Sequence, residues 1–203
     1  NRLMEDGWRP PELFSAKSAD GTTDQWGVMW KPFDFDPSRK YPIVTRVYPG
    51  RMEEFIPRRF QPINAETTLA QLGCIVVRFG NRGGTRLRGG AYREFAREEF
   101  RDYGLADKRA VIEELADRFD FIDVDRVGIF GGSSGGFMTV SAMLVHPDFF
   151  KVGVAMTGPH DPYLQSAEWV ERYAGVERIV EEDGSESWKP AEVSSNLELA
   201  ANL

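Results

Sequence analysis

Residues 126–145 read Arg-Val-Gly-Ile-Phe-Gly-Gly-Ser-Ser-Gly-Gly-Phe-Met-Thr-Val-Ser-Ala-Met-Leu-Val, and this stretch decides the fold. It begins as a short apolar strand over 126–130 and continues, after a block of Gly and Ser, as a helix over 134–145. His146-Pro147 ends the helix, because a residue before proline disfavours the α conformation. A strand that passes directly into a helix needs a very tight turn, which glycines two residues before and after its central residue permit.

The turn matches the pattern Gly-x-Ser-x-Gly, which holds a serine hydroxyl at the positive end of the following helix. The pattern fits in two registers, one centred on Ser133 and the other on Ser134. In either register the next backbone N–H points to where an oxyanion would form, which indicates nucleophilic catalysis of acyl transfer. A phosphate-binding Gly/Ser turn is the alternative, although the block lacks a Walker lysine and the spacing of a dinucleotide fingerprint.

The surrounding elements predict a mostly parallel sheet with helices on both faces, because short β-rich runs alternate with helical periodicity. Segments 13–19 and 27–31 read as an antiparallel hairpin across the turn Asp20-Gly21. Further strands are expected at 41–48, 74–79 and 152–157, and further helices at 64–72, closed by Gly73, and at 105–119. The acidic, Ser-rich segment 180–196 is expected to be a surface loop, and 197–203 a helix or an approach segment.

Composition narrows the class of protein. The 203 residues carry a formal net charge of −7 and 41% hydrophobic residues, which fits one globular domain and argues against a nucleic-acid surface. Cys74 lies in an apolar run and is expected in the core. No metal or cofactor is implied, and no apolar run reaches the roughly 18 residues that span a bilayer. We expect a solvated loop and helix face from six arginines interleaved with glutamates: Arg78, Arg82, Arg86, Arg88, Arg93 and Arg97.

The block 126–139, with His146-Pro-Asp-Phe-Phe-Lys-Val-Gly-Val-Ala after it, resembles the prolyl oligopeptidase family of serine peptidases, most of all its dipeptidyl peptidase IV and acylaminoacyl-peptidase branches. The resemblance implies an α/β-hydrolase fold, with residues 1–203 a partial peptidase domain that lacks the final strands and the family's N-terminal β-propeller. Shorter blocks along the chain carry the same resemblance: Ser18-Ala-Asp-Gly-Thr, Lys40-Tyr-Pro-Ile-Val, Val47-Tyr-Pro-Gly, Asn81-Arg-Gly-Gly and Glu171-Arg-Tyr-Ala-Gly.

The resemblance also implies roles for single residues. The family's nucleophile precedes x-Gly-Gly, which selects Ser133, while Tyr48 falls at the oxyanion tyrosine, acting with the backbone N–H of Ser134. Tyr163 and Trp169 fall closest to the family's aromatic substrate pocket. Pattern alone favours an ordinary strand-end tyrosine at Tyr48, and it leaves the other two aromatics equally open to a role as core residues. The dipeptidyl branch carries Trp and Tyr beside the nucleophile, where this chain has Gly and Ser, so a strict preference for proline is not implied.

Catalytic residues on this fold follow in the order Ser, Asp, His, and the resemblance places the Asp and the His beyond residue 203. The two histidines present are poor substitutes, because His146 ends a helix of about 12 residues, roughly 18 Å long, and His160 falls at a pocket position.

We therefore expect a serine peptidase that forms an acyl-enzyme on short peptides, releasing dipeptides or acylated residues. The rest of its own polypeptide, propeller and C-terminal segment included, would complete it, and these residues alone would be inactive. An esterase on the same fold and a catalytically silent module are the alternatives. A homo-oligomer, and a bacterial periplasmic or cytoplasmic location, stay open.

Overall fold

The computed structural model describes residues 2–49, 54, 56–57, 59–85, 87–95, 104–161, 164–173, 175–191 and 193–202. The strands of this part of the chain are β1 (Glu12–Lys17), β2 (Asp24–Trp30), β3 (Tyr41–Arg46), β4 (Ile75–Phe79), β5 (Ile122–Gly132), β6 (Phe150–Met156), β7 (Val176–Val180) and β8 (Glu186–Pro190). The helices are α1 (Arg2–Glu5), α2 (Ala65–Ala70), α3 (Gly90–Glu94), α4 (Leu105–Arg118), α5 (Ser134–Val145), α6 (Ala167–Tyr173) and the 3₁₀ helix η2 (Asn196–Asn202).

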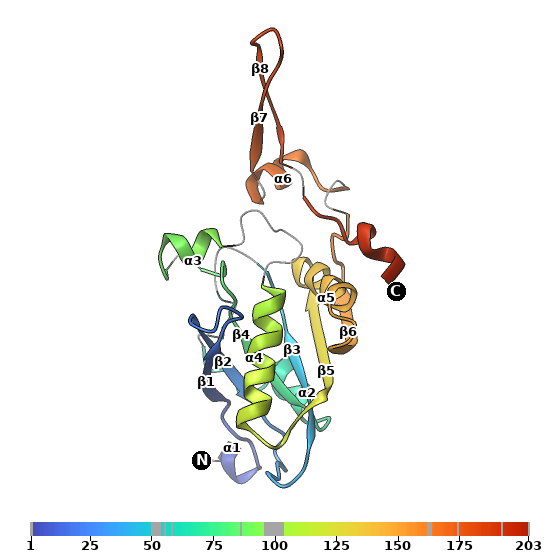
Figure 1. Ribbon diagram of the computed structural model, residues 1–203. Helices are drawn as coiled ribbons and strands as arrows, with labels where there is room; N and C mark the ends of the chain where they lie inside the picture. The colour runs from blue at the N-terminus through green and yellow to red at the C-terminus, as the bar shows by residue number, and fades with distance from the viewer. Residues whose placement is uncertain are drawn as a thin grey trace.

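Six of the strands form one sheet in the order β1-β2-β4-β3-β5-β6 (Figure 1). β1 pairs antiparallel with β2, and β2 pairs antiparallel with β4. The strands β4, β3, β5 and β6 are parallel neighbours, so their carboxyl ends share one edge of the sheet. The opening hairpin and the mostly parallel sheet predicted from the sequence are therefore confirmed.

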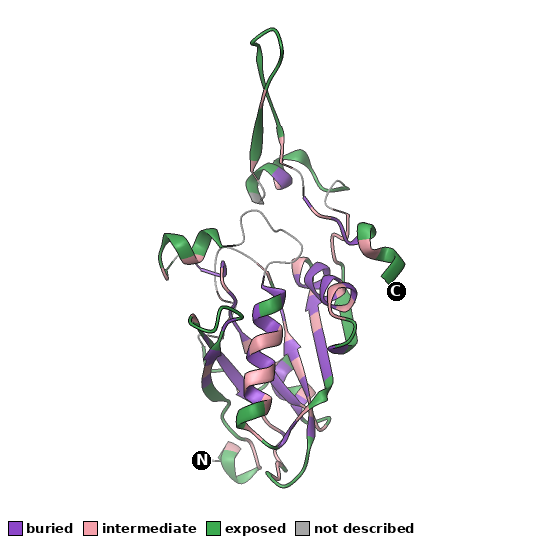
Figure 2. Cartoon of the chain, viewed as in Figure 1, coloured by how far each residue is buried: buried purple, intermediate pink, exposed green. Residues whose placement is uncertain are grey.

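Helices cover both faces of the sheet, as the sequence predicted. On one face, Ile112 of α4 and Met138 of α5 belong to the main buried cluster with Ile43 and Ile129 of the sheet. On the other face, Ala70 of α2 packs in a smaller cluster, which includes Trp30 of β2 and Val76 of β4. Burial is concentrated in the sheet and in the helix faces turned toward it (Figure 2). Such burial on both faces explains why the central strands read as continuous apolar runs.

The expectation of a surface loop over 180–196 is wrong, because β8 lies inside this segment and pairs antiparallel with β7. Its charged residues pair across the two strands: Arg178 with Glu186, and Lys189 with Glu177 at 3.3 Å. A hairpin whose opposite charges pair across its strands has the same charged composition as a surface loop. The composition of this segment therefore led to the wrong prediction. The β7–β8 hairpin projects past the carboxyl edge of the sheet (Figure 1).

The expected solvated face of arginines is also wrong for the arginines nearest the sheet. Arg78 donates to Glu66 of α2 at 3.0 Å, and the Glu66 side chain is only 1% exposed. Arg82 pairs with the fully buried Asp107 side chain at 2.8 Å, and Arg88 pairs with Glu54 at 3.1 Å. The acidic partners come from distant segments, so sequence proximity could not reveal them. Arg86 and Arg97 lie outside the described residues.

Candidate active site

Ser133 forms the turn between β5 and α5 with a backbone conformation that side chains rarely adopt, φ 56° and ψ −127°. Its N–H donates to the carbonyl of Met156 at 2.8 Å, which ties the turn to the end of β6. Its own carbonyl accepts from the N–H groups of Gly136 and Phe137, at 2.8 and 3.1 Å, and so starts α5. Ser134 is the first residue of α5. The strained turn is therefore centred on Ser133, and the Ser134 N–H lies in the first helical turn, whose N–H groups lack partners within the helix.

Glycines on either side of Ser133 allow strand, helix and the neighbouring β3 to meet backbone to backbone. A Cβ built on Gly131 would lie 2.6 Å from the carbonyl carbon and oxygen of Gly135 and 2.7 Å from the carbonyl oxygen of Val47. A Cβ on Gly135 would lie 2.4 Å from the same Val47 oxygen. A Cβ on Gly132 would be in ordinary contact, at 3.7 Å from Cε of Met156. Side chains are excluded two residues before and after Ser133, which matches the Gly-x-Ser-x-Gly register centred there.

Tyr48 follows β3 and lies beside this turn. The N–H of Val47 donates to the carbonyl of Phe130 at 2.9 Å, which extends the pairing of β3 with β5 to the residue before Tyr48. The position that a Gly135 Cβ would take is 3.5 Å from Cδ2 of Tyr48, and the tyrosine is 41% exposed. The structure thus brings Tyr48 and the Ser133 turn together at the carboxyl edge of the sheet, where open α/β sheets bind ligands.

Of the two aromatics predicted to line a substrate pocket, the structure describes one. Trp169 lies in α6, with its N–H 2.9 Å from the carbonyl of Ser166, and α6 stands beyond the carboxyl edge of the sheet (Figure 1). Tyr163 lies outside the described residues. The structure therefore puts the helix of Trp169 at the same carboxyl edge of the sheet as Ser133.

Neither histidine forms a hydrogen bond with Ser133 in the described part of the chain. His146 caps the far end of α5, and its ring lies 6.5 Å from that of Phe150. His160 follows β6, and its Nδ1 lies 3.2 Å from Nδ2 of Asn196. That the chain's own histidines are poor general bases for Ser133 stays a prediction.

Buried charges fix the loop that follows β4 at the same edge. Lys108 of α4 is 2% exposed, and its Nζ donates to the carbonyls of Phe79 and Gly80. Burial lowers the pKa of Lys108 to about 7, although the nearby Asp107 carboxylate opposes the shift. Asp107 accepts from the backbone N–H groups of Arg82 and Ala19 at 2.9 and 3.0 Å. These groups hold loops together rather than face an open site.

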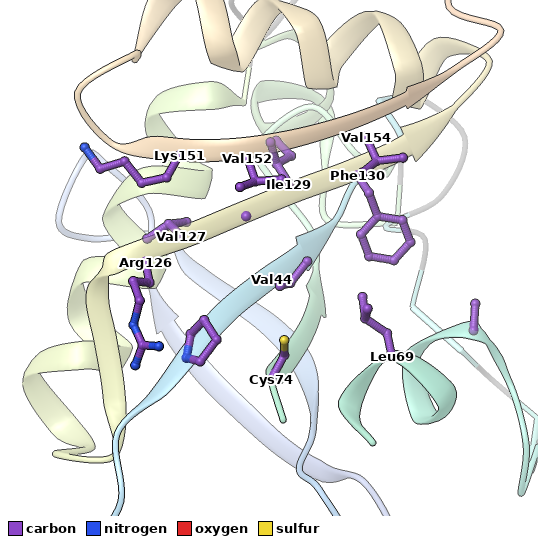
Figure 3. A pocket seen from close by; sticks show the side chains of 13 residues that line it. Val44, Leu69, Cys74, Arg126, Val127, Ile129, Phe130, Lys151, Val152 and Val154 are labelled. Atoms are coloured by element: carbon purple, nitrogen blue, oxygen red, sulfur yellow. The ribbon is translucent and has the colours of Figure 1, made fainter. Parts of the chain in front are cut away.

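A cavity of about 600 Å³ lies against the sheet face opposite α5 (Figure 3). Val44, Phe130 and Val154 line it, and Leu69 of α2, the helix on this face, lines it as well. Cys74 also lines it and is half-buried, and this burial raises the pKa of the thiol. The cavity is an uncovered part of the sheet rather than a catalytic cleft. Val152 and Val154 of β6 are 62% and 54% exposed there.

Other kinds of site find no support in the described residues. They include no group of three or more His, Cys, Asp or Glu side chains placed to hold a metal ion. None of the helices they form is both long enough and apolar enough to cross a membrane.

Comparisons with known proteins agree with the geometry. The sequence profile of the prolyl oligopeptidase family matches residues 60–202. Dipeptidyl peptidase 8 of Homo sapiens is 35% identical over 170 residues, which cover 83% of this chain and 19% of that protein. Prolyl endopeptidase FAP of Mus musculus is 26% identical over 206 residues, covering 100% of this chain and 26% of the relative. The crystal structure of Porphyromonas gingivalis dipeptidyl peptidase 4 matches with a TM-score of 0.80 and 26% identity, over 97% of this chain and 26% of that one.

A mostly parallel sheet with a serine on a strained strand-to-helix turn defines the α/β-hydrolase fold, and the structural match confirms it. Within that class, the chain belongs to the prolyl oligopeptidase family. It spans between 19% and 26% of the length of the three relatives compared above.

Sequence reasoning missed the contribution of the neighbouring backbone to this site. The Met156 carbonyl holds Ser133, and Thr157 after it also has a positive φ, 48°. Such a φ is uncommon for a β-branched residue, and nothing in the sequence around Thr157 signals it. Only the glycines around Ser133 could have pointed to the close approach of β3.

Proposed function

We propose that these residues form the nucleophile-bearing part of the catalytic domain of a serine peptidase, with Ser133 as the nucleophile. The observation that carries the proposal is the strained φ of 56° at Ser133, at the start of α5 and between two glycines that admit no side chain. Strain of this kind costs roughly 1–3 kcal/mol and is typical of active sites. Membership in the prolyl oligopeptidase family supports the same reaction class.

In the proposed reaction, Ser133 Oγ forms a bond to the peptide carbonyl carbon while a general base takes the hydroxyl proton. The carbonyl oxygen gains negative charge and accepts hydrogen bonds from the Tyr48 hydroxyl and the Ser134 backbone N–H. The base then gives its proton to the leaving amine, and the peptide bond breaks to leave an acyl-enzyme. Water attacks the ester in the same way and releases the acid and Ser133.

The base and its carboxylate partner would come from polypeptide outside these 203 residues. The uncovered part of the sheet supports this, because parallel sheets are normally buried on both sides, whereas Val152 and Val154 are exposed. The small share of each relative's length that matches supports it as well. On this proposal residues 1–203 are a partial α/β-hydrolase domain, accompanied by the β-propeller that the family resemblance implies, and are inactive by themselves.

The proposed substrates are short peptides, from which the enzyme would release dipeptides or acylated residues. Relatives named dipeptidyl peptidase support this class of substrate. Tyr163 and Trp169 would line the pocket for the residue before the scissile bond, and the position of α6 beyond the carboxyl edge supports this for Trp169. Since Gly132 and Ser134 replace bulky aromatics, we expect the pocket to accept residues other than proline.

Labelling with a fluorophosphonate probe, followed by peptide mass spectrometry, tests the proposal in the intact protein. We expect the label on Ser133, its loss in Ser133→Ala and its retention in the matched control Ser134→Ala, whose backbone N–H is unchanged. Label on Ser134 would refute the assignment, and absence of label from folded protein would refute the serine mechanism. Hydrolysis of peptide anilides would separate the peptidase from an esterase, because both cleave simple esters and only the peptidase expels the poorer amine leaving group.

A further inference from the structure

The loop that leaves β6, residues 157–161, packs directly against the turn of Ser133. The last residue of β6, Met156, accepts the Ser133 N–H at 2.8 Å. A Cβ built on Gly158 would lie 2.6 Å from the backbone nitrogen of Phe137, in the first turn of α5. The loop and the start of α5 therefore touch backbone to backbone, so a shift of one displaces the other.

Both turns of this contact are strained. In the described residues, Ser133 and Thr157 are the non-glycine residues with positive φ, 56° and 48°. Strained backbone persists only where the surroundings over-determine it, and such strain gathers at functional sites. Some further contact must therefore hold the loop in place.

Asn196, at the start of η2, supplies that contact. Its backbone N–H donates to the His160 carbonyl at 3.0 Å, and the Ser195 hydroxyl donates to the same carbonyl at 3.0 Å. Its Nδ2 lies 3.1 Å from the carbonyl of Phe137 and 3.2 Å from Nδ1 of His160, and its Oδ1 lies 2.8 Å from the Ser141 hydroxyl. Asn196 is 3% exposed and Ser141 is fully buried. One amide thus joins the loop to two turns of α5.

These partners determine which ring nitrogen of His160 accepts a hydrogen bond. A carbonyl only accepts hydrogen bonds, so the group of Asn196 that faces the Phe137 carbonyl is its NH₂. The second N–H of that group points at His160 Nδ1, which must accept, and the ring proton therefore resides on Nε2. A proton on Nδ1 would set donor against donor and break the link.

We propose that His160 is a positioning residue: its neutral imidazole, held through Asn196, fixes the 157–161 loop beside Ser133 and so sets the wall against which the peptide substrate is placed. The inference rests on the proposed role of Ser133. It does not make His160 the general base, because Nδ1 is already occupied by Asn196.

Two substitutions at one position separate this role from mere packing. His160→Asn keeps an oxygen acceptor near the place of Nδ1, whereas His160→Gln moves it toward the place of Nε2. In the intact protein we expect His160→Gln to lower kcat/KM for peptide anilides about 10- to 100-fold, as displacement by up to ~1 Å does. The small fluorophosphonate probe should still label Ser133, and ratios between substrates that differ in the residue before the scissile bond should change.

His160→Asn should restore turnover and substrate ratios toward those of the unmodified protein. Asn196→Ala should act like His160→Gln, and combining the two should cost little more than either alone, because they break the same link. Normal turnover in His160→Gln, or equal impairment in His160→Asn, would overturn the proposal. Loss of labelling in His160→Gln with an unchanged Tm would overturn it in favour of a direct role on the serine. Absence of label from Ser133 in the unmodified protein would instead defeat the proposed function itself.

Discussion

Gly131→Ala tests whether the backbone approach at the Ser133 turn matters for catalysis. The new methyl carbon would lie 2.6 Å from backbone atoms of Gly135, about 0.8 Å short of the 3.4 Å at which ordinary contact begins. It would also lie 2.7 Å from the Val47 carbonyl oxygen, next to Tyr48. Backbone cannot rotate away as a side chain can, so β3 and α5 must separate. Overpacking of this kind costs about 1–3 kcal/mol.

Displacement by about 0.8 Å would move Ser133 relative to the proposed oxyanion donors, Tyr48 and the Ser134 N–H. Because a misplacement of ~1 Å can cost roughly 100-fold in rate, we expect kcat/KM of the intact protein for a peptide anilide to fall about 100-fold in Gly131→Ala. The matched control is Gly132→Ala, whose methyl carbon meets nothing closer than 3.7 Å and should leave activity near that of the unmodified protein. Unfolding curves should show that both variants fold. Full activity in Gly131→Ala, or a selective loss in Gly132→Ala, would refute the register centred on Ser133.

Two further predictions concern the buried charges. The Lys108 pKa is about 7 in the folded protein and near ~10.4 when unfolded, so between these values the unfolded state binds more protons and this residue makes stability rise with pH. Urea unfolding at pH 7, 8 and 9 should show that the free energy of unfolding rises by at most about 1.4 kcal/mol per pH unit relative to Lys108→Met. If the free energies of the two proteins change with pH in parallel, Lys108 does not titrate in this range. Asp107→Asn should lower the free energy of unfolding by about 3–5 kcal/mol, because it leaves the Arg82 pair broken inside the protein. Its control, Asp148→Asn, removes a surface partner of Arg109 and should change stability little.

The sequence predicts those elements whose own residues determine their structure. The helix α5 matches its prediction of 134–145, since a strained turn starts it and His146-Pro147 ends it. Asn64 caps α2 by accepting the N–H of Thr67 at 2.7 Å, and Gly73 beyond it has φ 87°. In contrast, β7 and β8 depend on pairing with each other, and their charges read as loop composition. Patterns within a short stretch of sequence therefore predict helices and turns here, whereas the sequence does not reveal that two polar segments pair as strands.

The candidate site shows the same limit. Motif and resemblance point to Ser133 and Tyr48, and the structure places both at the carboxyl edge of neighbouring strands. The resemblance does not point to Asn196, because its role depends on Phe137 and His160 lying beside it in the fold. A residue that acts by joining segments 36 and 59 positions away carries no local pattern.

The order of the strands also limits the sheet edge at which a segment that carries the proposed general base can pair. Ser133 leaves β5, and β6 is its outer neighbour. A strand added beside β6 would lie two strand spacings from β5, about 10 Å, whereas one added beside β1 would lie five spacings away, about 24 Å. A loop that follows a parallel strand emerges at the same edge as Ser133 and can cover the shorter distance with a side chain and a few residues. The exposed valines of β6 project from the sheet face next to this edge, so polypeptide added there would also bury apolar surface. We therefore expect the polypeptide that supplies the base to pair first with β6.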